Sequence, residues 1–156
     1  MLYYILAAVL VVIDQLVKLW VRASIPLGQS IPFLPGLMDL TYIQNTGAAF
    51  SSFSSLTWLL ALISLIASAA VAVLMARKLF TRPLGQLSLA LILAGAVGNL
   101  IDRALLGFVT DMFATAFMNF AVFNVADICV VVGGILMVLY VLFFYDKQKE
   151  APHDAP

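Results

Sequence analysis

The sequence has little charge and few side chains that bind metals or form disulfides. Charged residues make up 10% of the 156 residues and hydrophobic residues 64%, whereas a typical soluble domain has roughly 25% charged residues. This balance excludes an ordinary water-soluble domain and indicates an integral membrane protein. The length allows one compact unit, residues 1–156. The formal net charge of zero gives no reason to expect a nucleic-acid partner.

The chain has only one cysteine and one histidine, which limits the kinds of catalytic and metal sites that it can form. Cys129 has no second cysteine with which to form an internal disulfide, and zinc-binding spacing is lacking. His153 stands in the polar tail, residues 146–156. We therefore expect no histidine-based triad, no metal site and no cofactor.

Four apolar segments are long enough to cross a bilayer, which needs about 20 residues per helix. They cover residues 2–21, 56–75, 84–101 and 126–145. The first segment lacks the positive start of a signal peptide, so we expect it to be retained as a span.

Basic residues predict the orientation. The short link 77–82 carries three of them and the segment 147–149 carries two, and the positive-inside rule places both in the cytoplasm. Both termini would then lie inside, and the long connections 22–55 and 102–125 outside. Two basic residues near the outer end of the first span argue against this, but the three in one short loop outweigh them.

The outer connections also show patterns. Residues 37–44 are rich in strand formers and precede a turn at 45–47, which predicts a short antiparallel sheet on the outer surface. Residues 108–113 and 114–123 are apolar but too short to span, and we expect a flap or half-buried helix in the interface. The predicted fold is an all-α membrane protein with four transmembrane helices, a small extracytoplasmic β-sheet and a short interfacial helix.

Four of the eight acidic residues, Asp14, Asp102, Asp111 and Asp127, stand inside or against apolar segments. A carboxylate in such a place is costly unless it is paired, protonated or functional. Asp14 is about 12 residues into the first span, or roughly 18 Å along a helix, which is past the midplane on the outer side. The four acids are therefore predicted to converge at one depth, as expected of a site.

Asp111 and Asp127 form the best candidate catalytic pair. Two carboxylates in one site cannot both ionise cheaply, so one keeps a proton. The charged member can activate water while the neutral member polarises the substrate. The alternative is that each is hydrogen-bonded separately and has a structural role.

The remaining polar residues allow two interpretations each. Asp14 and Lys18 are four apart, either as a neutralising pair or as support for the active acids. Asn124 could cap the fourth span or orient Asp127. The turn that contains Asn45 and Gly47 could be an ordinary turn or a binding site for an extended peptide.

The polar residues at the end of the third span also allow two interpretations. Asn99 and Asp102 share a helix face, and Arg103 could snorkel at the helix end or join Asn99 in binding polar substrate groups. Gly95 and Gly98 are more typical of close helix packing than of substrate contact.

In combination these motifs resemble the bacterial lipoprotein signal peptidases, or type II signal peptidases. Any one motif is weak, but five in order on four spans are strong. They are Ile13-Asp14-Gln15 with Lys18, Asn45-Thr46-Gly47-Ala48-Ala49-Phe50, Gly98-Asn99-Leu100-Ile101-Asp102-Arg103, Val109-Thr110-Asp111 and Phe123-Asn124-Val125-Ala126-Asp127.

The resemblance implies an aspartic peptidase of the bacterial cytoplasmic membrane that cuts diacylglyceryl-modified prolipoproteins just before the lipidated cysteine. It implies membrane lipids as surroundings and globomycin-type molecules as inhibitors. Asp111 and Asp127 match the family's catalytic dyad. Positions that support the site or contact substrate are Asp14, Lys18, Asn45, Gly47, Asn99, Asp102, Arg103 and Asn124.

Two features depart from the family pattern: Thr110 stands where a valine is expected, and the stretch between the two catalytic positions is short and free of charge. An alternative from another class is a small proton- or cation-conducting transporter subunit that uses Asp14, Asp102 and Asp127. Acids spread through the bilayer depth would favour that alternative, and acids clustered at one depth favour the enzyme. For a scaffold protein, a third possibility, the acids would be needless.

Overall fold

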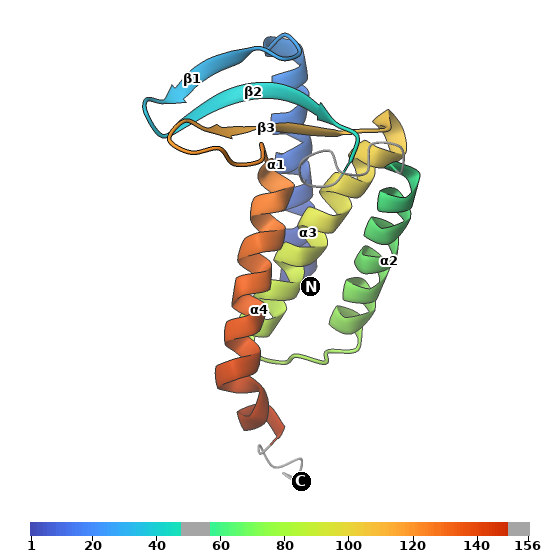
Figure 1. The fold of residues 1–156 in the computed structure, drawn as a ribbon. Helices are drawn as coiled ribbons and strands as arrows, with labels where there is room; N and C mark the ends of the chain where they lie inside the picture. The colour runs from blue at the N-terminus through green and yellow to red at the C-terminus, as the bar shows by residue number, and fades with distance from the viewer. Residues whose placement is uncertain (48–56, 150–156) are drawn as a thin grey trace.

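The computed structural model describes residues 1–47 and 57–149, and within these ranges it contains four helices and one three-stranded sheet (Figure 1). The helices are α1 (Leu2–Ser24), α2 (Thr57–Ala76), α3 (Pro83–Leu106) and α4 (Val125–Lys149). The strands are β1 (Ser30–Leu34), β2 (Met38–Asn45) and β3 (Val109–Thr115). The predicted helices and small antiparallel sheet are confirmed.

Each of these helices is long and apolar enough to cross a membrane. α3 packs against α1, α2 and α4, and the buried core of the bundle consists mainly of small side chains around Ala90 and Ala94. Large apolar side chains such as Leu16, Ile66 and Leu142 are exposed instead. Such an apolar outer surface suits a bundle that is surrounded by lipid.

Local signals set the ends of α3 and α4. Pro83 occupies the first turn of α3, where its missing N–H removes no hydrogen bond. Gly107 ends α3 with a φ of 78°, a conformation that glycine adopts without strain. α4 begins directly after Asn124. The polar residues predicted to form the site therefore lie near the C-terminal end of α3 and the N-terminal end of α4.

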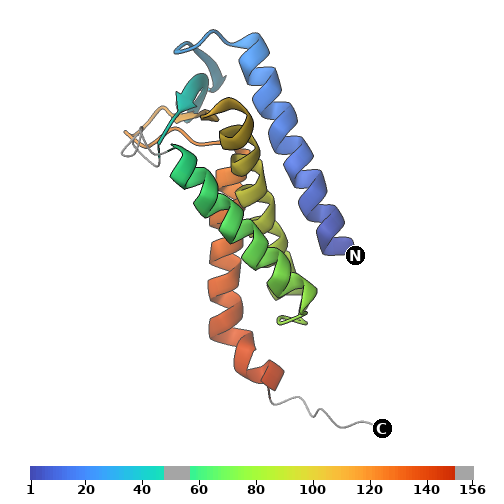
Figure 2. The same ribbon diagram turned by 90° about the vertical axis from the view of Figure 1, so that its right-hand side faces the viewer.

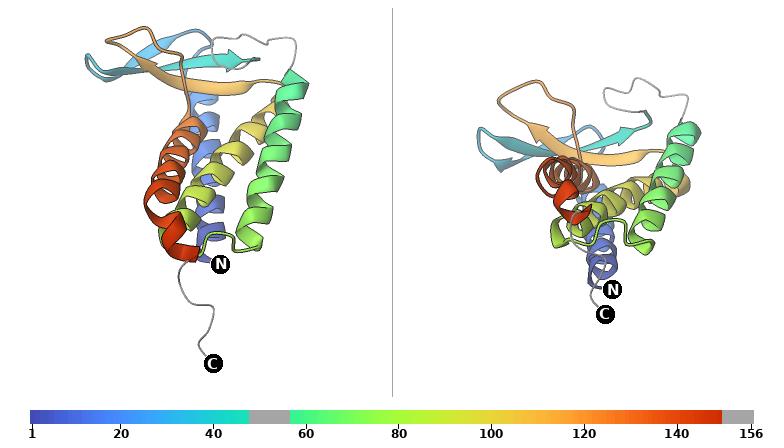
Figure 3. Two further views of the ribbon diagram at one scale, coloured as in Figure 1. Left: turned by 60° about the horizontal axis from the view of Figure 1, so that its bottom comes forward. Right: turned by 90° about the horizontal axis from the view of Figure 1, so that it is seen from below.

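The strand order is β1-β2-β3, and both pairs are antiparallel. The sheet lies across one end of the helical bundle, while α1 begins and α4 ends at the other (Figures 1 and 2). Views from below show the helices grouped beneath the sheet (Figure 3). In the β2–β3 register, Asp111 is opposite Ile43 and Val109 is opposite Asn45. This register brings Asn45 to the same end of the sheet as Asp111.

The short interfacial helix expected between residues 108 and 123 is not found in the described part of the chain. Residues 109–115 form β3 instead, and the chain then turns back so that Phe123 pairs with Phe113. β-branched and aromatic residues in this stretch suit a strand, and β2 offers an edge for pairing.

Candidate active site

The two acids predicted to form the catalytic pair lie at one cavity of about 440 Å³. Asp111 comes from β3 and Asp127 from the first turn of α4. The cavity is therefore at the end of the bundle that the sheet covers (Figure 1). Its polar lining is Asn45, Gly47, Asn99, Arg103, Asp111, Asn124 and Asp127, and its apolar lining is Val109, Phe120, Ala121, Val122, Phe123, Ile128, Val131 and Val132.

Asn124 connects the two acids. Its side-chain Nδ2 donates a hydrogen bond of 2.7 Å to Oδ1 of Asp111, and its backbone N–H donates one of 3.2 Å to Oδ2 of Asp127. Its Oδ1 accepts the backbone N–H of Asp127 at 2.9 Å. Asn124 therefore caps α4 and contacts both carboxylates, so the two roles that its spacing allowed occur together.

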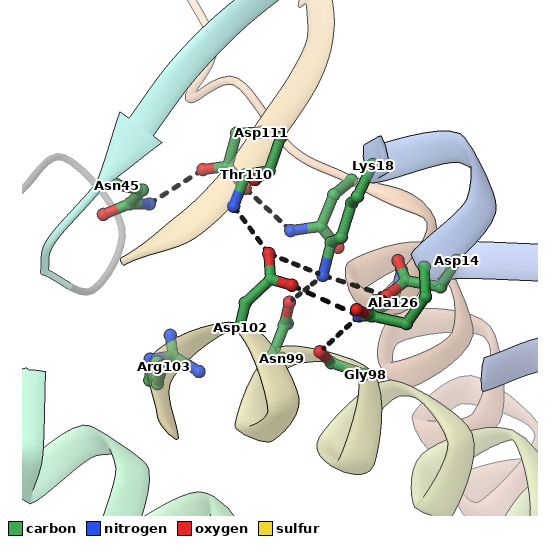
Figure 4. Close-up of polar contacts among 12 residues, drawn as sticks. Asp14, Lys18, Asn45, Gly98, Asn99, Asp102, Arg103, Thr110, Asp111 and Ala126 are labelled. Carbon is green, nitrogen blue, oxygen red and sulfur yellow. Dashed lines mark hydrogen bonds and ion pairs between the residues drawn. The ribbon is translucent and has the colours of Figure 1, made fainter. Parts of the chain in front are cut away.

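Two further asparagines complete the hydrogen bonds to the acids. Asn45 Nδ2 donates to Oδ2 of Asp111 at 2.8 Å, a contact drawn in Figure 4. Asn99 Nδ2 donates to Oδ1 of Asp127 at 2.8 Å. The Oδ1 of Asn45 accepts the backbone N–H of Gly47 at 3.0 Å, which holds the turn. Every oxygen of the two carboxylates thus receives an N–H donor.

Burial controls the ionisation of Asp111. Its side chain is 2% exposed, and this desolvation raises the pKa of Asp111 from 3.8 to about 6. The amides of Asn45 and Asn124 oppose the rise, because they stabilise the charged form, while the nearby charge of Asp127 adds to it. Asp111 therefore titrates close to neutral pH, as acid–base chemistry requires.

Asp14, Lys18 and Asp102 form a buried ionic cluster (Figure 4). None of the three lines the cavity. The Nζ of Lys18, which is 0% exposed, lies 2.9 Å from Asp14 and 3.5 Å from Asp102. It also donates to Oδ1 of Asn99 at 3.0 Å. Asp14 and Lys18 are therefore a neutralising pair, and Lys18 also contacts Asn99, which holds Asp127.

Asp14 also anchors the start of α4. Its Oδ1 accepts the backbone N–H of Ala126 at 2.9 Å, a favourable place for an anion at a helix N-terminus. The approach requires a glycine on α3, because a Cβ on Gly98 would lie 2.7 Å from Oδ2 of Asp14. A Cβ on Gly95 would likewise collide with the carbonyl of Ala126. Both glycines serve close packing of α1, α3 and α4.

Arg103 lines the cavity from the last turn of α3. Its NH1 donates to Oγ of Ser64 on α2 at 3.3 Å. Its buried Nε has no hydrogen-bond partner among the described residues. An unsatisfied buried donor beside a cavity is available to a polar group of a ligand.

Two residues near the site, Gln15 and Arg22, were given no role from the sequence. Gln15 Nε2 bonds to Asp14, Asp102 and the carbonyl of Gly98, and Arg22 contacts Thr110 and Asp102. Arg22 could have been found, since it lies four residues after Lys18 on the same helical face. The Ala48-Ala49-Phe50 part of the predicted peptide-binding turn lies outside the described residues.

The four acids gather at the sheet end of the bundle and do not line its full length, which is the arrangement expected of an enzyme. Within 1–47 and 57–149 no group of three or more His, Cys, Asp or Glu side chains could hold a metal ion.

Comparisons with known proteins show the family to which the chain belongs. The family described as Signal peptidase (SPase) II matches residues 6–143. The lipoprotein signal peptidase of Enterococcus faecalis is 38% identical over 148 residues, which cover 95% of this chain and 92% of that protein. The one from Lactococcus lactis subsp. lactis is 42% identical over 140 residues, covering 90% and 91%.

Two solved structures have the same fold, and both are described as a bacterial membrane enzyme determined by the in meso method. The one at 2.3 Å resolution has a TM-score of 0.85, 27% identity, and covers 99% of this chain and 94% of its own. The one at 1.9 Å has a TM-score of 0.83, 28% identity, and covers 91% and 93%.

The fold and the family match thus define a membrane-embedded peptidase. The chain belongs to the signal peptidase II family and is a multi-pass protein of the bacterial inner membrane.

Proposed function

We propose that this protein is an aspartic endopeptidase that removes signal peptides from diacylglyceryl-modified prolipoproteins, by cleavage just before the lipidated cysteine. The observation that carries the proposal is the shared cavity of Asp111 and Asp127, whose carboxylates are joined through Asn124. Asp14, Lys18 and Asp102 act as supporting residues that do not line the cavity.

The chemistry follows from two carboxyl groups that share one proton. The ionised member takes a proton from a water molecule, whose oxygen attacks the carbonyl carbon of the scissile peptide bond. The protonated member gives its proton to the carbonyl oxygen, which forms a tetrahedral diol. Collapse of the diol breaks the C–N bond, and a carboxyl proton passes to the departing cysteine nitrogen.

The asparagines and Arg103 have binding roles in this proposal. Asn45 and Asn99 hold the two acids through one amide hydrogen each, which leaves the other N–H of each amide for substrate. Arg103 lines the cavity, and its Nε, which has no hydrogen-bond partner among residues 1–47 and 57–149, can donate to a substrate carbonyl. The apolar lining around Phe120 and Val131 suits the apolar signal peptide and the acyl chains.

The sheet end of the bundle is proposed to face the extracytoplasmic side. The basic link 77–82 joins α2 to α3 at the opposite end of the molecule (Figure 1), and basic loops favour the cytoplasm. Both termini would then be cytoplasmic. On this side a lipid-modified precursor would present its cleavage site, and a globomycin-type inhibitor would enter the cavity.

Cleavage of a purified prolipoprotein tests the proposal directly. The enzyme in detergent or liposomes is given the same precursor with and without diacylglycerol on its cysteine. We expect a new N-terminus at the lipidated cysteine, found by mass spectrometry, and little cleavage of the unmodified precursor. Equal cleavage of both forms, or a cut elsewhere, would contradict the proposed specificity.

A further inference from the structure

Arg22 connects α1 to the strand that carries Asp111. It lies near the end of α1, and its side chain is 22% exposed. Its NH1 donates a hydrogen bond of 2.9 Å to Oγ1 of Thr110 and lies 3.9 Å from Oδ1 of Asp102. Thr110 directly precedes Asp111 in β3, so Arg22 acts one residue away from a proposed catalytic acid.

Thr110 is held from two directions at once. It is 0% exposed, and its backbone N–H donates a hydrogen bond of 2.9 Å to Oδ2 of Asp102 on α3. Its hydroxyl accepts the bond from Arg22 on α1. A valine at this position would offer no oxygen to an arginine, so the side-chain bond depends on the hydroxyl of Thr110.

Arg22 also contributes to the charge balance of the buried ionic cluster. Asp14 and Asp102 are buried with Lys18, which by itself could neutralise only one of them. Arg22 supplies the second positive charge, next to Asp102. Without it a buried carboxylate would be left incompletely paired, which is costly in a poorly solvated place. Asp102 is also the acceptor that holds the backbone of Thr110.

We infer that Arg22 is a positioning residue for Asp111, acting through the hydroxyl of Thr110 and the carboxylate of Asp102. The inference rests on the proposed function and names a residue that controls the placement of one member of the acid pair. Neither Arg22 nor Thr110 lines the cavity. Their loss should therefore disturb the chemical step and leave the contacts that bind substrate in place.

The test compares kcat and KM for cleavage of a lipidated prolipoprotein by four variants: Arg22→Gln, Thr110→Val, Thr110→Ser and the Arg22→Gln/Thr110→Val double. We expect kcat of Arg22→Gln to fall roughly tenfold, the scale of one lost charge-assisted hydrogen bond, with KM close to wild type. Thr110→Val should lose activity severalfold, Thr110→Ser should keep it, and the double variant should be no worse than Arg22→Gln.

Matched controls separate positioning from general damage. Arg77→Gln removes an exposed arginine at the other end of the bundle, and Thr41→Val removes a buried hydroxyl of the same sheet that bonds to the carbonyl of Gln29. Both should keep the wild-type kcat. Thermal melting reports whether each variant folds. If Arg22→Gln does not fold, the comparison of the nearly isosteric Thr110→Val with Thr110→Ser is sufficient to test the inference.

The outcomes are distinct. Wild-type kcat in Arg22→Gln, equal losses in the controls, or independent effects of Arg22 and Thr110 in the double variant would each overturn the inference. Failure of the unmutated enzyme to cleave the lipidated precursor would instead overturn the proposed function, and the inference with it.

Discussion

Lys18 determines which way the amide of Asn99 points. The Nζ of Lys18 donates to Oδ1 of Asn99 at 3.0 Å, so the Nδ2 of Asn99 faces Asp127, to which it donates at 2.8 Å. Amide orientation is often ambiguous, but a cation on one side and a carboxylate on the other leave one arrangement. The fully buried Lys18 on α1 is thereby connected to Asp127 on α4 through Asn99 on α3.

Lys18→Met should therefore destabilise the protein. It leaves Asp14 and Asp102 buried with less positive charge, and breaking a buried pair from one side costs about 3–5 kcal/mol. Thermal melting in detergent measures the loss. The Asp14→Asn/Lys18→Met double variant should be more stable than Lys18→Met, and Lys78→Met, in the basic link, should melt like wild type. A Lys18→Met protein with unchanged melting would show that the cluster is not coupled to stability.

The pH dependence of cleavage should respond to Asn45. Burial raises the pKa of Asp111 to about 6, even though the amide of Asn45 lowers it. Asn45→Ala removes that donor, so the pKa of Asp111 rises and the limb of the pH–rate profile that it sets moves to higher pH. Asn119→Ala, on the exposed loop before α4, should leave the profile in place. A shift to lower pH in Asn45→Ala would contradict this assignment.

Asp111 should make the folded protein less stable as the pH rises from about 4 to above 6. Its pKa in the folded protein, about 6, is above its ordinary value of 3.8. The folded state therefore binds the proton more tightly, and the associated stability, complete below pH 4, is lost as pH rises through about 6. Asp111→Asn removes the buried charge. Its Tm should exceed that of wild type at pH 8 and match it near pH 4, and a lower Tm at pH 8 would argue against the raised pKa.

The orientation can be tested with single cysteines in a Cys129→Ala background. Ser30→Cys lies on exposed β1 at the sheet end, and Arg77→Cys lies on the exposed link at the other end. In cells whose cytoplasmic membrane is intact and directly accessible to the reagent, an impermeant maleimide should label the Ser30→Cys variant and not the Arg77→Cys variant. Labelling of Arg77→Cys alone would reverse the topology and place the cavity in the cytoplasm.

Much of this arrangement follows from simple physical rules. Apolar run lengths located the helices, and the helical rise placed Asp14 at the depth where its carboxylate meets the N–H of Ala126. The i, i+4 spacing of Asp14 and Lys18 predicted their ion pair. The run lengths and the i, i+4 spacing depend on distances within one helix, which the sequence determines directly, whereas the contact between Asp14 and Ala126 joins two helices.

Other features depend on tertiary contacts. The third strand was missed because residues 109–115 are apolar enough for a membrane interface, and their pairing depends on the edge offered by β2. The bond between Arg22 and Thr110 joins residues 88 positions apart. Spacing along the chain also did not reveal that Asn124 bonds to both acids, because this requires β3 to pass beside the start of α4.

The pairing of Asp111 with Asp127 in catalysis is tested most directly by the cleavage rate of a lipidated prolipoprotein with Asp111→Asn, Asp127→Asn and the double variant. Each single variant should fold and insert, yet lose nearly all activity, and the double variant should be little worse, because the two acids act as one unit. Hydroxylamine should trap no acyl-enzyme during wild-type turnover, and Cys129→Ala should keep substantial activity. Full activity in either single variant would contradict the dyad.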